Sequence, residues 1–265
     1  MYAFDYHKPS SLQEAASLLA GNEEATLVAG GQTLIPTLKH RLAQPSDLID
    51  LSGVAELRGI TLEGDTLVIG AMTSHADVAS DATVRSAIPA LADLAGGIGD
   101  AQVRNCGTIG GSVSNNDPAA DYPAALLALG ATIVTTNRSI PADEFFTGMF
   151  DTALQHGEIV TEVRIPKPAR AAYAKFPNPA SRYAIVGVMV ADSGGAVRVA
   201  VTGAGQDGVF RATDIEQALA GSFSAETAKA VAISPDNLSA DIHASAEYRA
   251  HLVAVMASRA VAACS

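Results

Sequence analysis

The sequence predicts an α+β fold with a larger N-terminal domain, residues 1–172, and a smaller C-terminal α+β domain, residues 173–265. Three observations carry this prediction. Strand and helix signals alternate over residues 1–53, as in a βαβ unit. Beyond Gly53, short Gly-containing turns join β-rich segments, as in antiparallel hairpins. A Pro-Lys-Pro stretch then opens a linker at residues 166–172, and the pattern changes after it.

The first subdomain, about residues 1–53, is predicted to be compact and βαβ-like. Glu14 follows Ser11 by three residues and completes a capping box, and Gly21 ends the helix. Pro36 falls in the first turn of a second helix, where a missing N–H does no harm. The expected elements are an edge strand over residues 2–9, a helix capped by Ser10 or Ser11, a strand over 26–29, a helix carrying Leu34, Leu38 and Leu42, and a strand over 47–51.

The second subdomain, about residues 54–172, and the C-terminal domain are predicted to consist of hairpins and helices. Glu63-Gly64-Asp65 and Asp192-Ser-Gly-Gly195 each predict a hairpin turn. The expected elements before the linker are strands over 57–62 and 66–71, helices over 75–80, around 87–96 and over 119–129, and strands over 131–135 and 158–165. After it we expect strands over 183–191 and 196–202, then helices around 214–220, 225–232 and 247–263.

Composition excludes several classes of protein. The net charge of −11 argues against a nucleic-acid partner, because phosphate binding requires clustered Lys and Arg. Two distant cysteines and six scattered histidines predict no disulfide framework, zinc site or iron–sulfur cluster within this chain. The N-terminus lacks the basic and apolar regions of a signal peptide, and no apolar run approaches a membrane span, so we expect a cytoplasmic protein.

Two glycine-rich stretches indicate a binding function. Ala29-Gly30-Gly31-Gln32-Thr33 and the longer Gly107–Asp121 each hold a Gly-Gly pair that ends in a hydroxyl residue. Glycine lets the backbone approach a ligand and leaves N–H groups to donate, so the two turns could grip the two phosphates of a dinucleotide. The polar tail Asn115–Asp121 could reach sugar hydroxyls. Either turn alone is equally typical of a tight turn without a ligand, and neither matches G-x-G-x-x-G or a P-loop.

A wider set of motifs resembles a known family. The first glycine turn, Arg104-Asn-Cys-Gly-Thr-Ile-Gly-Gly-Ser112, Asp117-Pro-Ala-Ala-Asp121, Arg182-Tyr-Ala-Ile-Val-Gly187 and Ser245-Ala-Glu-Tyr-Arg249 together are similar to the FAD-binding medium subunit of molybdenum-containing hydroxylases, the flavoprotein of the carbon monoxide dehydrogenase and xanthine dehydrogenase family. The resemblance covers nearly the whole chain. It implies a two-subdomain FAD-binding domain of the vanillyl-alcohol oxidase/xanthine dehydrogenase type, followed by an antiparallel sheet with helices.

The resemblance also implies roles for individual residues. Ala29, Gly30, Gly31, Gln32 and Thr33, with Thr108, Ile109, Gly110, Gly111 and Ser112, would hold the FAD pyrophosphate. Asp121 would contact the sugar or ribityl region, with Asn115 a weaker candidate, and Lys175 would lie close to the flavin ring. Without the resemblance Lys175 is interpreted as a surface lysine. Ile98 stands where relatives carry an aromatic residue; Tyr183 is either part of the stacking partner or an aromatic of the C-terminal core. Cys106 is interpreted as a packing residue.

The function that the resemblance implies is electron transfer. Electrons would pass from a molybdenum centre through two [2Fe–2S] clusters on partner subunits to FAD on this chain, and then to a terminal acceptor. The partners would be a large molybdopterin subunit and a small iron–sulfur subunit, in a dimer of heterotrimers. No residue of this chain is expected to act on the organic substrate, and the resemblance identifies neither that substrate nor the terminal acceptor. A free-standing flavin oxidase and a flavin-less assembly subunit are the alternatives.

Overall fold

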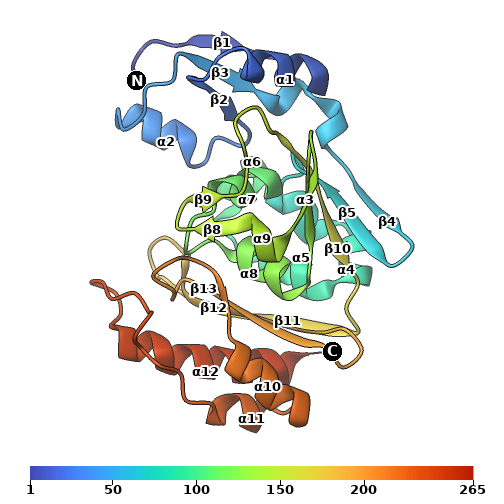
Figure 1. The fold of residues 1–265 in the computed structure, drawn as a ribbon, viewed down its shortest axis with the longest axis vertical. Coiled ribbons are helices and arrows are strands. Elements are labelled where there is room, and N and C mark those ends of the chain that lie inside the picture. The colour runs from blue at the N-terminus through green and yellow to red at the C-terminus, as the bar shows by residue number, and fades with distance from the viewer. Residues whose placement is uncertain (265) are drawn as a thin grey trace.

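The computed structural model describes residues 1–264. Figure 1 shows three parts that follow one another along the longest axis, in chain order from the blue N-terminal part to the orange and red C-terminal part. None of the helices in residues 1–264 combines the length and the apolar character needed to cross a bilayer. The elements of each part are described in turn because the candidate site draws residues from all three.

The N-terminal part is a three-stranded parallel sheet in the order β1-β3-β2, with two helices. Ser11 caps the first helix as predicted: its hydroxyl accepts from the Glu14 N–H at 3.2 Å, and the Glu14 carboxylate accepts from the Ser10 N–H at 2.9 Å. Leu42 lies beyond the second helix and is exposed, so the helical repeat predicted through it was wrong. The elements are β1 Asp5–His7, α1 Leu12–Ala20, β2 Ala25–Val28, α2 Leu34–Lys39 and β3 Asp47–Asp50.

The central part contains a five-stranded antiparallel sheet in the order β4-β5-β10-β6-β7. The hairpin at Gly64 is confirmed, but its first strand begins later than predicted because Ala55–Leu57 forms a 3₁₀ turn. Its strands are β4 Ile60–Glu63, β5 Thr66–Gly70, β6 Thr132–Thr135, β7 Ser139–Pro141 and β10 Val160–Pro166, with a separate pair of β8 Phe146–Gly148 and β9 Asp151–Thr152. Its helices are α3 His75–Ser80, α4 Ala82–Ala87, α5 Pro89–Gly96, α6 Ala101–Cys106, α7 Ile109–Asn115, α8 Asp121–Ala128 and α9 Ala142–Phe145, and a second 3₁₀ turn spans Leu51–Gly53.

Two helices of this part were not predicted. The helix expected around residues 87–96 is confirmed as α5, which Pro89 starts at its first position, but α4 before it was missed. The second glycine turn is largely helical. Thr108 caps α7, accepting the N–H of Gly111 at 3.1 Å, and the two glycines form its first turn.

The C-terminal part is a four-stranded antiparallel sheet in the order β11-β12-β13-β14, followed by three helices. The hairpin at Asp192–Gly195 is confirmed, and its turn is tied by the Gly195 N–H donating to Asp192 Oδ1 at 2.7 Å. The predicted linker was wrong in its second half, because residues 170–172 already belong to a strand. The elements are β11 Arg170–Pro177, β12 Ala184–Asp192, β13 Val197–Thr202, β14 Phe210–Arg211, α10 Thr213–Gly221, α11 Ala225–Ala230 and α12 Ala246–Ala263.

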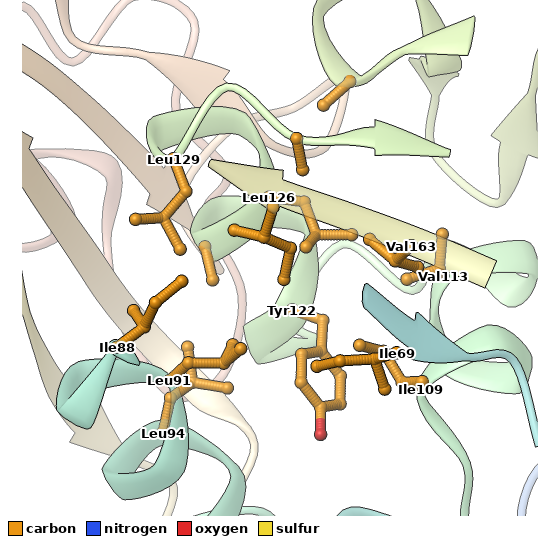
Figure 2. Close-up of a cluster of buried hydrophobic side chains, with 14 of the residues drawn as sticks. Ile69, Ile88, Leu91, Leu94, Ile109, Val113, Tyr122, Leu126, Leu129 and Val163 are labelled. Atoms are coloured by element: carbon orange, nitrogen blue, oxygen red, sulfur yellow. The ribbon is translucent and has the colours of Figure 1, made fainter. Parts of the chain in front are cut away.

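One sheet joins the central and C-terminal parts. Helix α12 packs on one face of β11 and β12, while α5 and α8 pack on the other, and every residue of β12 is buried between them. Figure 2 shows the core on the central side, where side chains of α5, α7 and α8 meet those of the five-stranded sheet. Met189 and Ala200 of the C-terminal sheet belong to the same cluster as Leu91 and Leu126. The two parts therefore share a hydrophobic core.

Candidate functional site

A cavity of about 510 Å³ lies where the three parts of the chain meet. Its volume is in the range of sites for cofactors and other small molecules. All of the predicted binding residues line it except Ile109 and Lys175: the cavity contacts Ala29, Gly30, Gly31, Gln32, Thr33, Ile98, Thr108, Gly110, Gly111, Ser112, Asn115, Asp121 and Tyr183. Ile109 instead points into the central core, where it is fully buried (Figure 2).

The two glycine turns lie against each other at one side of the cavity. A side chain at Gly30 would place its Cβ 2.1 Å from the carbonyl oxygen of Cys106, and one at Gly110 would lie 2.5 Å from Ala71 Cβ. At Gly111 a Cβ would approach Ala29 Cβ to 3.4 Å. Gly30 and Gly111 are thus needed for the contact that brings the two turns together, and Gly110 for the contact with Ala71. The sequence had predicted a different reason for these glycines, namely room for a ligand.

The free backbone donors come from the first turn. Within residues 1–264, the N–H groups of residues 30–33 donate to no protein acceptor. In the second turn, Ile109 donates to Thr73 O at 3.1 Å and Gly110 to Ala71 O at 2.9 Å. The expectation that both turns offer free N–H groups was therefore wrong for residues 109–112 of the second turn. That turn still presents hydroxyl groups to the cavity, from Thr108 and Ser112.

Asp121 is a buried carboxylate at the start of α8, with only 4% of its surface exposed. Its Oδ1 accepts the Tyr173 hydroxyl at 2.5 Å and its Oδ2 accepts Lys175 Nζ at 3.0 Å. Burial raises the pKa of the Asp121 carboxyl, and the Lys175 cation and the Tyr173 hydrogen bond oppose this rise. Lys175 lies behind Asp121 with its side chain 11% exposed, so the surface-lysine interpretation was wrong.

Three cationic side chains hold the turn that carries Ile98. Lys175 Nζ donates to Gly97 O at 3.0 Å, and Arg104 Nη1 donates to Ile98 O at 2.9 Å and Gly99 O at 3.0 Å. Arg182 Nη1 adds a bond to Gly99 O at 3.1 Å. All three carbonyls of this cavity-lining turn are bound by cations from different elements. Both arginines lie within the motifs of the family resemblance, but their role in holding this turn could not be predicted from the sequence.

The polar tail before α8 is fixed by the surrounding elements. Asn116 adopts a left-handed conformation with φ of 42°, and its side-chain amide donates to Gly148 O at 2.8 Å and to Asp151 O at 2.7 Å. Further along, the Thr202 hydroxyl donates to Ala120 O at 2.7 Å. These bonds place Asn115 and Asp121 on the same cavity wall.

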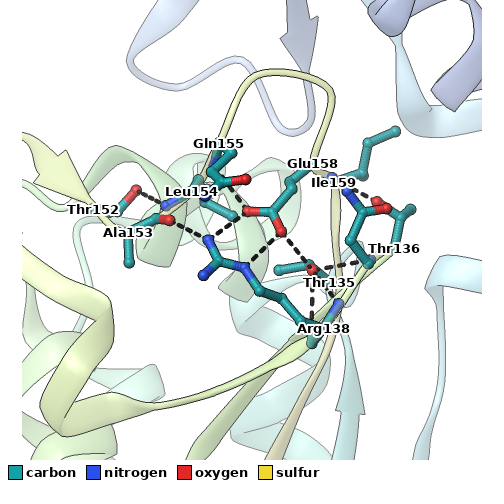
Figure 3. A network of polar contacts seen from close by, with 10 residues as sticks. Thr135, Thr136, Arg138, Thr152, Ala153, Leu154, Gln155, Glu158 and Ile159 are labelled. Carbon is teal, nitrogen blue, oxygen red and sulfur yellow. Dashed lines mark hydrogen bonds and ion pairs between the residues drawn. The ribbon is translucent and has the colours of Figure 1, made fainter.

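A further wall of the cavity depends on an ion pair between a buried carboxylate and a partly exposed arginine. Figure 3 shows the Glu158 carboxylate between the Arg138 guanidinium and the backbone N–H of Gln155. Arg138 Nε lies 2.8 Å from Glu158 Oε1, and the pair holds the loop that leads into Ile159 and Val160, which line the cavity. Hydrogen bonding from Arg138 lowers the pKa of Glu158 below its ordinary value.

Sequence reasoning missed several lining residues. His75 follows a buried strand end, and Ser181 and Arg182 belong to the loop before β12. Tyr183 is 44% exposed at the end of that loop, and the half-buried Ile98 also lines the cavity, so both candidate ring contacts lie at one site. Cys106 is exposed beside the first turn and does not line the cavity, so its interpretation as a packing residue was wrong.

The donor set suits a dinucleotide. Four consecutive backbone N–H groups and several hydroxyls can bind phosphate oxygens without a lysine. Apolar and aromatic side chains also line the cavity and can pack against the ring system of a dinucleotide. Gly31 turns the first stretch with φ of 68°, a conformation that favours glycine.

Comparison with known proteins agrees with this geometry. Residues 2–168 match the FAD binding domain in molybdopterin dehydrogenase, and residues 171–264 match the CO dehydrogenase flavoprotein C-terminal domain. The carbon monoxide dehydrogenase medium chain of Hydrogenophaga pseudoflava is 37% identical, with 97% of this chain and 96% of that protein covered. The nicotine 6-hydroxylase medium subunit of Paenarthrobacter nicotinovorans is 38% identical, with 98% and 96% covered.

Solved structures give the same result. Carbon monoxide dehydrogenase from H. pseudoflava, in a form lacking the Mo-pyranopterin moiety, superposes with a TM-score of 0.88 at 37% identity, covering 99% of this chain and 97% of that chain. Quinoline 2-oxidoreductase from Pseudomonas putida 86 gives 0.91 at 33% identity, covering 99% and 96%. The chain therefore belongs to the family of FAD-binding medium subunits of molybdenum-containing hydroxylases and is an oxidoreductase subunit.

Proposed function

We propose that this chain carries the flavin of a molybdenum hydroxylase complex and passes electrons from iron–sulfur clusters of a partner subunit to a terminal acceptor. The observation that supports it most is the row of N–H groups at residues 30–33, without protein acceptors in residues 1–264, on the wall of a cavity that also contacts Tyr183 and Ile98. When bound, FAD accepts two electrons and releases them singly or as a pair, which suits a junction between one-electron centres and another acceptor.

The proposed residue roles follow the cavity. The N–H groups of residues 30–33 and the hydroxyls of Thr108 and Ser112 bind the pyrophosphate. Asn115 and Asp121 bind sugar or ribityl hydroxyls, since each Asp121 oxygen keeps a second lone pair after its bond to Tyr173 or Lys175. Ile98 and Tyr183 contact the ring, and Lys175 acts on it from behind Asp121.

Partner subunits are part of the proposal. The relatives named above are medium chains or subunits by name, so we propose a large molybdopterin subunit and a small iron–sulfur subunit, assembled as a dimer of heterotrimers. Substrate oxidation would take place on the large subunit. The cytoplasm is the proposed location.

The decisive measurement is the visible spectrum of the complex purified with its partners, with mass spectrometry of whatever acid releases. We expect non-covalent FAD. Release of FMN would contradict the pyrophosphate assignment, and an intact complex without flavin would favour the assembly-subunit alternative. Direct oxidation of an organic substrate by the isolated flavin-loaded chain would favour a free-standing oxidase.

Gly30→Ala tests the first turn. Its Cβ would lie 2.1 Å from a backbone oxygen, so the two turns must separate and flavin content should fall by about tenfold or more. Gly96→Ala is the matched control: its nearest neighbour, Ala79 Cβ, is 3.9 Å away, and flavin content should stay unchanged. Equal flavin content in the two variants would overturn the role of the first turn.

A further inference from the structure

His75 is held against the second glycine turn, on the wall of the cavity. It is the first residue of α3, and Ser74 caps this helix. The His75 backbone N–H donates to Gly107 O at 2.9 Å, and Ser74 forms an isolated β-bridge with Thr108. The side chain is only 5% exposed, and its ring centroid lies 5.4 Å from that of Tyr122, so its position is fixed by packing.

The imidazole has no partner within residues 1–264. Its Nδ1 is buried and bonds to nothing, although buried polar atoms are almost always hydrogen-bonded. Its Nε2 lies beside Gly107: a Cβ at that glycine would approach Nε2 to 2.6 Å. Because Gly107 has no side chain, there is space for Nε2 next to the second glycine turn.

The surroundings decide where the imidazole proton sits. Burial and the nearby positive charge of Arg104 lower the pKa of His75 to about 4, so the ring is neutral at physiological pH and carries one N–H. The Tyr122 ring that packs beside it is fully buried and keeps its proton, because burial raises the pKa of Tyr122. An N–H enclosed without an acceptor is costlier than a lone pair without a donor, so the proton belongs on Nε2.

We propose that His75 is a further dinucleotide-binding residue whose Nε2–H donates to a phosphate oxygen of the cofactor beside Gly107 and Thr108. This inference rests on the proposed flavin function. It fits the site: the N–H groups of Ile109 and Gly110 are bonded within the protein, so the second turn offers fewer backbone donors to the pyrophosphate than the first turn does. An imidazole N–H supplies a donor directly beside that turn.

The test compares three variants of the flavin-depleted complex by titration with FAD and with riboflavin, which lacks phosphate. His75→Leu should weaken FAD binding about tenfold or more, the effect of losing one hydrogen bond to a charged group, and leave riboflavin binding unchanged. His75→Gln, which keeps an N–H donor, should recover much of the loss. His40→Leu is the control, because His40 is exposed at the end of α2 and outside the cavity.

A second measurement needs no variant. Nitrogen NMR of ¹⁵N-histidine-labelled protein should show the Nε2–H tautomer for His75, and FAD should shift this Nε2 resonance while riboflavin does not. FAD affinity unchanged in His75→Leu, or an Nδ1–H tautomer, would overturn the inference. Failure of the native complex to bind either flavin would instead contradict the proposed function, so the two failures are distinguishable.

Discussion

At the level of single residues, the surroundings of a side chain decide its role more than its type. Lys175 was expected from family resemblance to act as a cation near the flavin ring, yet it is paired with the buried Asp121 at 3.0 Å. A paired lysine and carboxylate form a nearly neutral unit, so its field at a distance is smaller than that of a lone cation. No sequence signal reveals this pairing, because the two residues are 54 positions apart.

We predict that Lys175→Met lowers the stability by about 3 kcal/mol, because it leaves a buried carboxylate without its cation. Burial already raises the pKa of Asp121, and loss of the cation raises it further. Because the pKa of Asp121 is higher in the folded state than in the unfolded chain, protonation of this carboxyl stabilises the folded state. The loss of stability in Lys175→Met should therefore be smaller at about pH 5 than at about pH 8. Urea unfolding at both pH values measures it.

Asp121→Asn combined with Lys175→Met is the control, since the double variant contains no buried carboxylate at position 121. It should lose the pH dependence. If the single variant shows the same deficit at both pH values, the ion pair does not explain the stability of this region.

At the level of elements, the sequence predicted segments in which one physical signal dominates. Gly64 and Gly195 marked the hairpin turns, and Ser11 marked the start of α1, because turn and cap preferences are local. Helix α7 was missed because its glycines disfavour a helix locally, whereas close contact with Ala71 requires the glycine at position 110. That contact is tertiary and leaves no trace in the segment itself.

The loop before β10 gives a prediction about pH. The pKa of Glu158 is lowered by its bond to Arg138, so its contribution to stability is present above about pH 4.5 and is lost as the pH falls through the folded-state pKa. We expect Glu158→Gln to cost about 1–3 kcal/mol at neutral pH and less near pH 3.

Thermal unfolding across this pH range measures the effect. Glu162→Gln is the matched control, since Glu162 lies on β10 and its side chain is 31% exposed in its pair with Arg164. A constant deficit for Glu158→Gln from pH 7 to pH 3 would contradict the assignment.

At the level of the whole molecule, the site could be located only in part from the sequence. The unusual composition of the two glycine turns and of the polar tail that ends at Asp121 pointed to these segments in the sequence. All three segments line one cavity. Arg182 and His75 could not be found in this way, because their roles arise from distant segments that the fold brings to one cavity. We propose that the domain division near residue 172 marks a change of architecture within one packed unit.

The shared core predicts cooperative unfolding. Because Met189 and Ala200 pack with Leu91 and Leu126, the central and C-terminal parts should unfold together. Hydrogen exchange followed by mass spectrometry over a urea series should show β5 and β13 losing protection at the same urea concentration. Earlier loss in β13 would indicate that the C-terminal part unfolds on its own.

The position of β12 sets the order of events during biosynthesis. This strand follows directly on the cavity residue Tyr183, and it is buried between α8 on one side and α12 on the other. Arg249 of α12 also bonds the Ile185 and Gly203 carbonyls at 2.6 Å, fixing the strand ends next to the cavity. The ribosome must therefore have released α12 from its exit tunnel before the cavity wall is complete, and flavin can be loaded only after this stage of synthesis.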